Sequence, residues 1–270
     1  MILGIDVGGT KTLMARFNES GEIIERTKFS TPADYNEFIT ELCAAVEAQS
    51  GVETIEAIGM SLPGTVNYEK NILEHFGNLG WENVAPHTDL NEKFSIPVKM
   101  DNDANIGALH EALRGAAKDY NSVCYITLST GIGSGFVFNG QIVPMLARSE
   151  AGAQFFNRED TKFVKWESFA SGKAFYDRYQ CFAEDETRQE VWDEYAADVA
   201  VGLRNIISVI NPEIIVFGGS VGAQLDKFKD ALEASLYDVN REFPVKPVLS
   251  VAEAGENSVI YGCFDLATHS

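Results

Sequence analysis

The sequence has few cysteines and no long apolar segment. Its 270 residues include only four cysteines, at Cys43, Cys124, Cys181 and Cys263, and no two of them form a C-x-x-C pair. Their apolar surroundings predict reduced core thiols and argue against a disulfide framework or a zinc knuckle. Apolar runs such as Ile214–Phe217 are too short to span a bilayer. The first residues lack a basic segment and include Asp6, so we expect no signal peptide and a cytoplasmic protein.

Basic residues are also scarce. The chain carries 21 Lys and Arg against 40 Asp and Glu, which gives a formal net charge of −19. Such a surface repels phosphate backbones and anionic lipids, so we expect no nucleic-acid or membrane partner. A nucleotide site remains possible, because backbone N–H groups and Mg²⁺ can hold phosphates without basic side chains. The four histidines show no metal-ligand spacing.

Two parts of the chain open with the same pattern. Ile2–Val7 is apolar, Gly8-Gly9 predicts a turn, and an extended segment follows. The pattern returns at Val123–Leu128, with a Gly-rich turn, a second strand and a hairpin turn at Asn139-Gly140. Each opening is followed by alternating helices and buried strands. We therefore predict an α/β fold of two similar domains flanking a cleft, with residues 1–116 and 258–270 in one and 117–257 in the other.

Hydrophobic periodicity places the elements between these openings. Phe38, Leu42 and Val46 share one helical face, and a long helix with Trp192 to Ile210 on its apolar face ends before Asn211-Pro212. The segment between Gly64 and a short helix at 89–94 is predicted to be a loop.

The two glycine turns are candidate phosphate sites. Glycines let the backbone approach a ligand and direct N–H groups at an anion, and Asp6 beside the first turn is suited to hydrated Mg²⁺. The second turn, Ser129–Gly133, adds hydroxyls, although either turn alone could be a plain hairpin. A strand rather than a helix follows Gly131-Ile132-Gly133, which excludes a Rossmann turn, and no Walker A lysine pattern occurs. Gly218-Gly219, between a strand and a helix, could border adenine or ribose.

Asp103 is the candidate general base. It lies where a strand meets a helix, so a structural N-cap is the simple alternative. A helix N-terminus favours the carboxylate and is expected to weaken it as a base. Asn102 offers a donor and an acceptor for a sugar hydroxyl. A serine nucleophile at Ser61 is excluded, because Pro63 follows and no helix forms the required elbow.

In combination, these segments resemble the ROK family of sugar kinases, which has the actin-like ATPase (ribonuclease H-like) fold. The resemblance rests on an ordered set of motifs: Gly4–Lys11, Ser61–Gly64, Asn78–Trp81, Asp101–Asn105, Ser129–Gly135 and Asn211–Gly219.

The resemblance implies a role for each matching residue. Asp103 would be the catalytic base. ATP and Mg²⁺ would be held by Asp6 (through water to Mg²⁺), Gly8, Gly9, Thr10, Lys11, Thr130, Gly131, Gly133, Gly218 and Gly219. The hexose would contact Gly64, Asn78, Asn102, Glu150 and Glu167. The resemblance also implies a homodimer.

The sequence departs from the family pattern at two places. Ala153 stands where relatives carry a sugar-binding histidine that often ligates zinc, and Asn157–Lys162 stands where a cysteine-rich zinc loop is expected. We therefore expect no structural zinc. Glucose is the expected sugar, with N-acetylmannosamine, fructose, allose and a phosphorylated β-glucoside as alternatives.

Other classes of function fit the sequence less well. A family repressor would carry a DNA-binding helix-turn-helix before the first phosphate turn, which here begins within ten residues of Met1. A sugar sensor that has lost catalysis is the main alternative, favoured by Ala153 and opposed by the presence of Asp6, Asn102 and Asp103. A hydrolase of the same fold would need an activated water, whereas Glu150 and Glu167 suit hydroxyl recognition.

Overall fold

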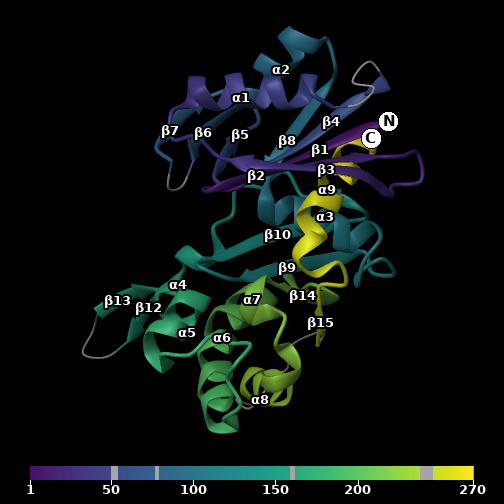
Figure 1. The fold of residues 1–270 in the computed structure, drawn as a ribbon. Coiled ribbons are helices and arrows are strands. Elements are labelled where there is room, and N and C mark those ends of the chain that lie inside the picture. The colour runs from purple at the N-terminus through teal and green to yellow at the C-terminus, as the bar shows by residue number, and fades with distance from the viewer. Residues whose placement is uncertain (50–53, 77–78, 159–161, 238–245, 270) are drawn as a thin grey trace. The chain divides into compact units, whose positions relative to one another are not determined.

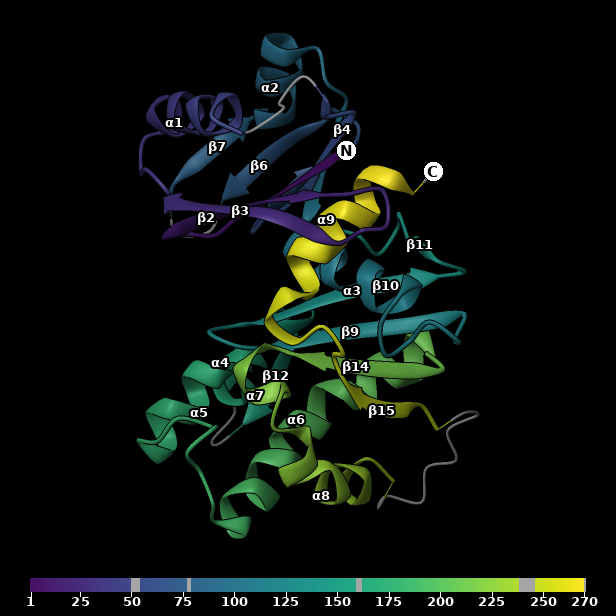
Figure 2. The ribbon, with the colours of Figure 1, turned by 45° about the vertical axis from the view of Figure 1, so that its right-hand side comes forward.

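The structure, a computed structural model, describes residues 1–49, 54–76, 79–158, 162–237 and 246–269. It divides into two compact units, Met1–His110 with Asn257–Ser270, and Glu111–Glu256. Figures 1 and 2 show both units as mixtures of strands and helices. The functional domains proposed from the sequence, with boundaries after 116 and 257, stay a prediction.

The first unit is built on a five-stranded sheet with the order β3-β2-β1-β4-β8. Its strands are β1 (Ile2–Val7), β2 (Lys11–Phe17), β3 (Ile23–Ser30), β4 (Ala57–Leu62) and β8 (Val98–Asn102). The first three form an antiparallel meander, whereas β1, β4 and β8 run parallel. Parallel strands need crossovers, and α1 (Tyr35–Glu47) and α2 (Pro86–Phe94) lie within the two connections that supply them.

Helices cover both faces of this sheet (Figure 1). Phe38 and Leu42 of α1 pack with Leu3, Ile5 and Ile58 in one core cluster. On the opposite face, α9 (Ser258–Thr268) packs against the sheet through a cluster of Ile2, Ala15, Phe17, Ile260 and Phe264. A sheet with helices on both faces buries its parallel strands from both sides, which accounts for their continuous apolar sequences.

The segment predicted to be a loop forms a second, three-stranded antiparallel sheet, so that prediction was wrong. It comprises β5 (Thr65–Asn67), β6 (Ile72–Phe76) and β7 (Trp81–Val84). Its strands are too short and polar to show clear alternation. Tertiary packing stabilises them, because the buried Phe76 and Trp81 rings join Phe38 of α1, with Trp81 4.6 Å from each of the other two ring centroids.

The second unit repeats the first arrangement, with the strand order β11-β10-β9-β14-β15. Its strands are β9 (Ser122–Leu128), β10 (Ile132–Phe138), β11 (Gln141–Ile142), β14 (Ile214–Gly218) and β15 (Val248–Val251). Again a hairpin meander precedes two parallel neighbours. The predicted repetition of one α/β pattern is confirmed.

The remaining elements complete the two units. They are α3 (Asp103–Leu113), 3₁₀ turns at Ala151–Ala153 and Gly255–Asn257, β12 (Phe155–Arg158), β13 (Lys162–Lys165), α4 (Glu167–Ala170), α5 (Gly172–Tyr179), α6 (Gln189–Ile210), α7 (Gly219–Gly222) and α8 (Leu225–Tyr237). The aromatic rings of Trp192 on α6 and Phe228 on α8 stack at 5.5 Å in the core beside β9 and β14. Among the described residues, no helix combines the length and the apolar character that crossing a membrane requires.

Local signals in the sequence agree with several turns. Asn139 and Gly140 both have positive φ angles, of 49° and 74°, which is the conformation of a two-residue hairpin turn. Asn211 adopts φ 52° directly after α6, as a left-handed helix cap. Cys43, Cys124 and Cys263 are buried free thiols, but Cys181 lies half-buried in the connection after α5. The expectation of four core thiols was therefore wrong at Cys181.

The close approach of α9 to the first sheet depends on glycine. A Cβ placed on Gly59 of β4 would lie 1.8 Å from the carbonyl oxygen of Cys263 on α9. That oxygen is backbone and cannot rotate away, so a side chain at residue 59 would push the helix off the sheet.

We therefore expect Gly59→Ala to lower the free energy of unfolding by about 3 kcal/mol or more, an overpacking cost. Gly9→Ala is the matched control, because a Cβ at Gly9 meets nothing within 4 Å. Its effect on stability should stay within about 0.5 kcal/mol. Urea unfolding of both variants measures the difference, and equal effects would contradict the packing argument.

Candidate functional site

Polar residues gather where the three parallel strands of the first unit end. Asp6 of β1 pairs in register with Ser61 of β4, and Ser61 pairs with Asp101 of β8. Asn102 ends β8, and α3 begins at Asp103. The carboxyl ends of parallel strands in α/β sheets are where ligands commonly bind. The sheet order thus brings residues nearly 100 positions apart to one edge.

The first glycine turn adjoins this edge. The Gly8 N–H donates to the Lys11 carbonyl at 3.0 Å, and the Thr31 hydroxyl donates to the Gly8 carbonyl at 2.8 Å. Thr31 is itself paired with the buried Thr12 hydroxyl at 2.9 Å. The turn is thereby braced from the sheet side, while the outward side at Gly9 is open space. Thr10 and Lys11 are exposed next to it.

Asp6 and Asp103 interact electrostatically. Burial, followed by repulsion from the Asp103 carboxylate, raises the pKa of Asp6 to about 6. Burial also raises the pKa of Asp103, against the opposing hydrogen bond from the Ala104 N–H. This direction is opposite to the one expected from the helix N-terminus, because the loss of hydration outweighs the helix dipole. Asp103 is therefore a stronger base than an exposed aspartate.

Asn102 connects Asp103 to the Gly64 loop. Its Nδ2 donates to the Gly64 carbonyl at 3.0 Å, and its Oδ1 accepts the Ala104 N–H at 2.9 Å. One N–H and one lone pair of the amide remain for a ligand. Gly64 has φ 142°, and a Cβ there would lie 2.0 Å from the His75 carbonyl oxygen, so only glycine fits. Asn78, the other predicted sugar contact in this unit, lies outside the described residues.

The second glycine turn has the same position in the other unit. It joins β9 to β10, with the Ser129 N–H donating to the Gly131 carbonyl at 3.0 Å. The Ser129 carbonyl accepts the Gly172 N–H at the start of α5, at 2.6 Å. Thr130 is exposed at the tip, and Gly133 lies on β10 opposite Thr127.

Three predicted segments meet beside this turn. The Glu167 carboxylate, on the first residue of α4, is 3.2 Å from where a Cβ on Gly131 would lie. A Cβ on Gly152 would lie 3.3 Å from Glu167 Cβ. Glu150, two residues before Gly152, is exposed and lines a groove of about 300 Å³ with mostly apolar neighbours from α6. Gly131 and Glu167 are thus in close proximity. The distance that places the Glu150 segment near Glu167 is that of Gly152, two residues further along the chain.

Gly218 and Gly219 border a small pocket of about 90 Å³ with Ser220, Val251 and Ala252. Gly219 has φ 79°, and a Cβ on it would lie 2.8 Å from the Thr127 hydroxyl. Thr127 was missed from the sequence because it sits in an apolar strand. Thr127 pairs in register with Gly218 of β14 near the end of β9. Asp6 holds the corresponding position on β1 in the first unit.

The segment that replaces the expected zinc loop is a hairpin, β12–β13, whose residues 159–161 lie outside the described part of the chain. Among the described residues, no group of three His, Cys, Asp or Glu side chains could hold a metal ion. An ion-pair network anchors the hairpin instead. Buried Asp198 on α6 accepts from Arg158 of β12 at 2.5 Å and from Arg178 of α5 at 2.7 Å.

This network also supports the helix that carries Glu167. The Arg158 guanidinium lies 4.3 Å from the centroid of the Phe169 ring on α4, and Trp166 Nε1 donates to the Asp198 carbonyl at 3.1 Å. A four-residue helix has no stability of its own, so α4 depends on such contacts.

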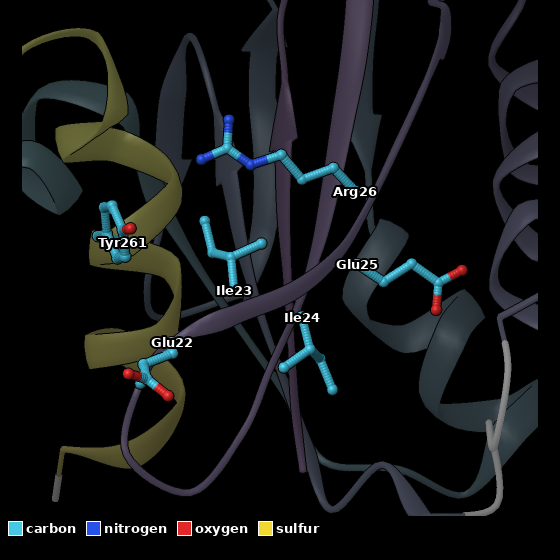
Figure 3. Close-up of a pocket in the computed structure, with 7 residues that line it drawn as sticks. Glu22, Ile23, Ile24, Glu25, Arg26 and Tyr261 are labelled. Atoms are coloured by element: carbon cyan, nitrogen blue, oxygen red, sulfur yellow. The ribbon is translucent and has the colours of Figure 1, made fainter.

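A further hollow of about 530 Å³ lies on the edge strand β3 and has no connection with these residues. Figure 3 shows Tyr261 of α9 beside Ile23, with Glu25 pointing away from both. Its exposed charges, Glu22 and Arg26, are of the kind that commonly protects an edge strand from further pairing.

The strand order shared by both units is that of the actin-like ATPase fold. A glucokinase of this fold from Streptomyces griseus, solved in complex with glucose and AMPPNP, superposes with a TM-score of 0.82 and 22% identity, covering 100% of this chain and 99% of that one. The ROK family model matches residues 2–270, and the chain belongs to the ROK family.

Named relatives of this chain are sugar kinases. An N-acetyl-D-glucosamine kinase from Mannheimia succiniciproducens is 28% identical, with 97% of each chain covered. A putative fructokinase from Bacillus subtilis is 30% identical, covering 84% of this chain and 80% of that protein.

The raised pKa of Asp6 predicts a pH-dependent cost to stability. The folded state keeps the Asp6 proton up to about pH 6, whereas the unfolded state releases it near pH 3.8. The folded state binds more protons in this window, so stability falls as the pH rises from 4 to 6, by roughly 3 kcal/mol from this group.

We expect Asp6→Asn to remove this contribution, so that the variant gains stability over the wild type as the pH rises from 4 to 7. Urea unfolding at several pH values measures the difference. Parallel pH profiles for the two proteins would show that Asp6 does not carry the cost.

The Asp198 network predicts a contrast between two carboxylates of α6 that contact Arg178. Asp198→Asn removes the buried negative charge that two guanidinium groups share and leaves one acceptor oxygen for both, so it should cost about 2–3 kcal/mol. Glu194 also pairs with Arg178 Nη1, at 3.3 Å, but is largely exposed. Glu194→Gln should cost less than about 0.5 kcal/mol. Denaturant unfolding compares the variants, and a cost at Asp198 no larger than at Glu194 would contradict an anchoring role.

Proposed function

We propose that this protein is an ATP-dependent hexose kinase, which transfers the γ-phosphate of Mg-ATP to a sugar hydroxyl, with glucose as the first sugar to test. The observation that carries the proposal is the proximity of Asp6 and Asp103 at one strand edge, beside an open glycine turn, in a ROK chain. The names of its relatives support the reaction class.

Asp103 is proposed as the base that accepts the proton of the attacking hydroxyl. Its raised pKa suits it to this role, and the half-buried carboxylate accepts the Ala104 N–H at 2.8 Å. Phosphoryl transfer passes through a loose transition state, so orienting the hydroxyl matters more than strong basicity. The free N–H and lone pair of Asn102 would bind the neighbouring sugar hydroxyls.

The first turn is proposed as a phosphate site. The N–H groups at Gly9 and Thr10 would point at phosphate oxygens, with Gly8 shaping the turn and Lys11 adding positive charge. The Asp6 carboxylate fits a hydrated Mg²⁺, because a cation would offset the repulsion from Asp103 that helps to raise the pKa of Asp6. Bound Mg²⁺ would neutralise charge on the phosphate oxygens.

The second unit is proposed to bind the rest of the nucleotide and part of the sugar. Thr130, Gly131 and Gly133 would contact phosphates, and the pocket beside Gly218 and Gly219 would take part of the adenosine. AMPPNP, bound by the Streptomyces griseus glucokinase, is a chemical analogue of ATP.

The sugar-binding set is proposed to comprise Gly64, Asn78, Asn102, Glu150 and Glu167. Glu167 is the best supported in the second unit, because its carboxylate adjoins the Gly131 turn. A small Ala153 in place of the family histidine leaves hydroxyl recognition to the two glutamates. We also propose a homodimer in the cytoplasm, and sedimentation velocity measures the assembly.

The central test is Asp103→Asn. We expect kcat to fall by about 10²–10⁴-fold, the usual contribution of a general base, with a small change in sugar KM. Stability should not fall, because the variant loses a carboxylate that burial disfavours. An ADP-release assay over glucose, N-acetylglucosamine, N-acetylmannosamine and fructose, with and without EDTA, measures these quantities.

The same assay separates the alternatives. Undiminished kcat in Asp103→Asn would exclude Asp103 as the base. Absence of turnover in the wild type with measurable sugar binding would favour a sugar sensor, the function that Ala153 would also suit. ATP hydrolysis without any sugar acceptor would point to a hydrolase.

A further inference from the structure

Tyr68 lies directly after β5, in the three-stranded sheet that the sequence did not predict. Its hydroxyl donates to Asp101 Oδ1 at 2.7 Å. The ring is 42% exposed, whereas Asp101 is only 5% exposed. Within the first unit, a partly exposed tyrosine therefore contacts a buried carboxylate at the end of β8.

Asp101 Oδ1 organises the direct junction between β8 and α3 that follows it (the Asn102–Asp103 loop). Besides the Tyr68 hydroxyl, it accepts Asn105 Nδ2 at 2.8 Å and the Asn102 N–H at 2.6 Å. Three donors on one oxygen offset much of the cost of burying the carboxylate. They also fix the backbone of Asn102, the residue that precedes Asp103.

β5 is thus attached to the loop from both of its ends. Before β5, the Gly64 carbonyl accepts Asn102 Nδ2 at 3.0 Å, and after β5, Tyr68 donates to Asp101. A single hydrogen bond leaves two segments free to pivot, but two bonds a strand apart fix their relative orientation. Asn105 Nδ2 also lies 3.4 Å from the Tyr68 hydroxyl and adds to this attachment.

We propose that Tyr68 and Asp101 are positioning residues, which hold the Asn102–Asp103 loop in register with the Gly64 segment. The inference rests on the proposed function for its effect on catalysis. Tyr68 acts through Asp101 and not on the sugar, so its loss should misorient Asp103 without removing a substrate contact. Small misplacements of a reacting group are costly in rate.

The test is Tyr68→Phe in the full-length protein, which removes one oxygen and keeps the ring. We expect kcat to fall roughly 10- to 30-fold, the scale of one hydrogen bond to a charged acceptor, with sugar KM changed less than about twofold. Tyr35→Phe is the matched control, because Tyr35 donates to Asp89 in the same unit without contacting the loop. Its kcat should equal that of the wild type.

A rise in sugar KM at unchanged kcat would overturn the proposal and make Tyr68 a substrate contact. Unchanged kinetics would overturn it as well. A double-mutant cycle with Asp101→Asn provides a second check. If Tyr68 acts through Asp101, Tyr68→Phe should add little to the Asp101→Asn loss, and full additivity would contradict the shared path.

Hydrogen exchange distinguishes failure of this inference from failure of the proposed function. Amides of residues 101–105 should exchange faster in Tyr68→Phe than in Tyr35→Phe or the wild type, whether or not the protein phosphorylates a sugar. If the wild type shows no turnover but exchange accelerates, the kinase proposal fails and the positioning contact stands. Unchanged exchange would refute the contact as a constraint on the loop.

Discussion

The burial of two neighbouring carboxylates, Asp6 and Asp103, is the constraint on which the strand edge of the first unit depends. The fold removes hydration from both carboxylates, which raises both pKa values, and the charge of Asp103 raises the pKa of Asp6 further. The order β1-β4-β8 enforces the encounter, since each strand end is held in register with the next. Two partly buried carboxylates lower the stability of the folded state, and proteins tolerate this loss where charge is needed for chemistry. A cation bound with a phosphorylated ligand would reduce the loss.

Hydrogen bonds around the two carboxylates hold the neighbouring backbone in place. Thr31 and Thr12 brace the turn next to Asp6, and Asn102 and Asp101 brace the loop next to Asp103. The loop is fastened in turn to the β5–β7 sheet at Gly64 and Tyr68. The residues of the first unit that could bind phosphate and sugar are therefore attached to one sheet edge and not to independent loops.

The two units share a strand order but differ in the side chains at the ends of their strands. The hairpin and parallel strands of the second unit repeat the first arrangement, but Thr127 stands at the strand position of Asp6 and Gly218 at that of Ser61. At this edge the second unit offers backbone groups, hydroxyls and the carboxylate of Glu167, which comes from α4 and not from a strand end. Under the proposed function, acid–base and metal chemistry would belong to the first unit, and neutral nucleotide contacts mainly to the second.

The sequence alone determined the elements whose signal is local. The glycine turns, the Asn139-Gly140 hairpin, the stop at Asn211-Pro212 and the apolar strands follow from backbone preferences and periodicity, and the motif order identified the family. Tertiary structure decided the rest. The strands β5–β7 and β12–β13 are too short for periodicity to show, and packing of Trp81 and the Asp198 ion pairs stabilise them. The raised pKa values, the placement of Thr127 and the Tyr68–Asp101 bond depend on strand register and burial, which bring distant residues together in ways that no local pattern encodes.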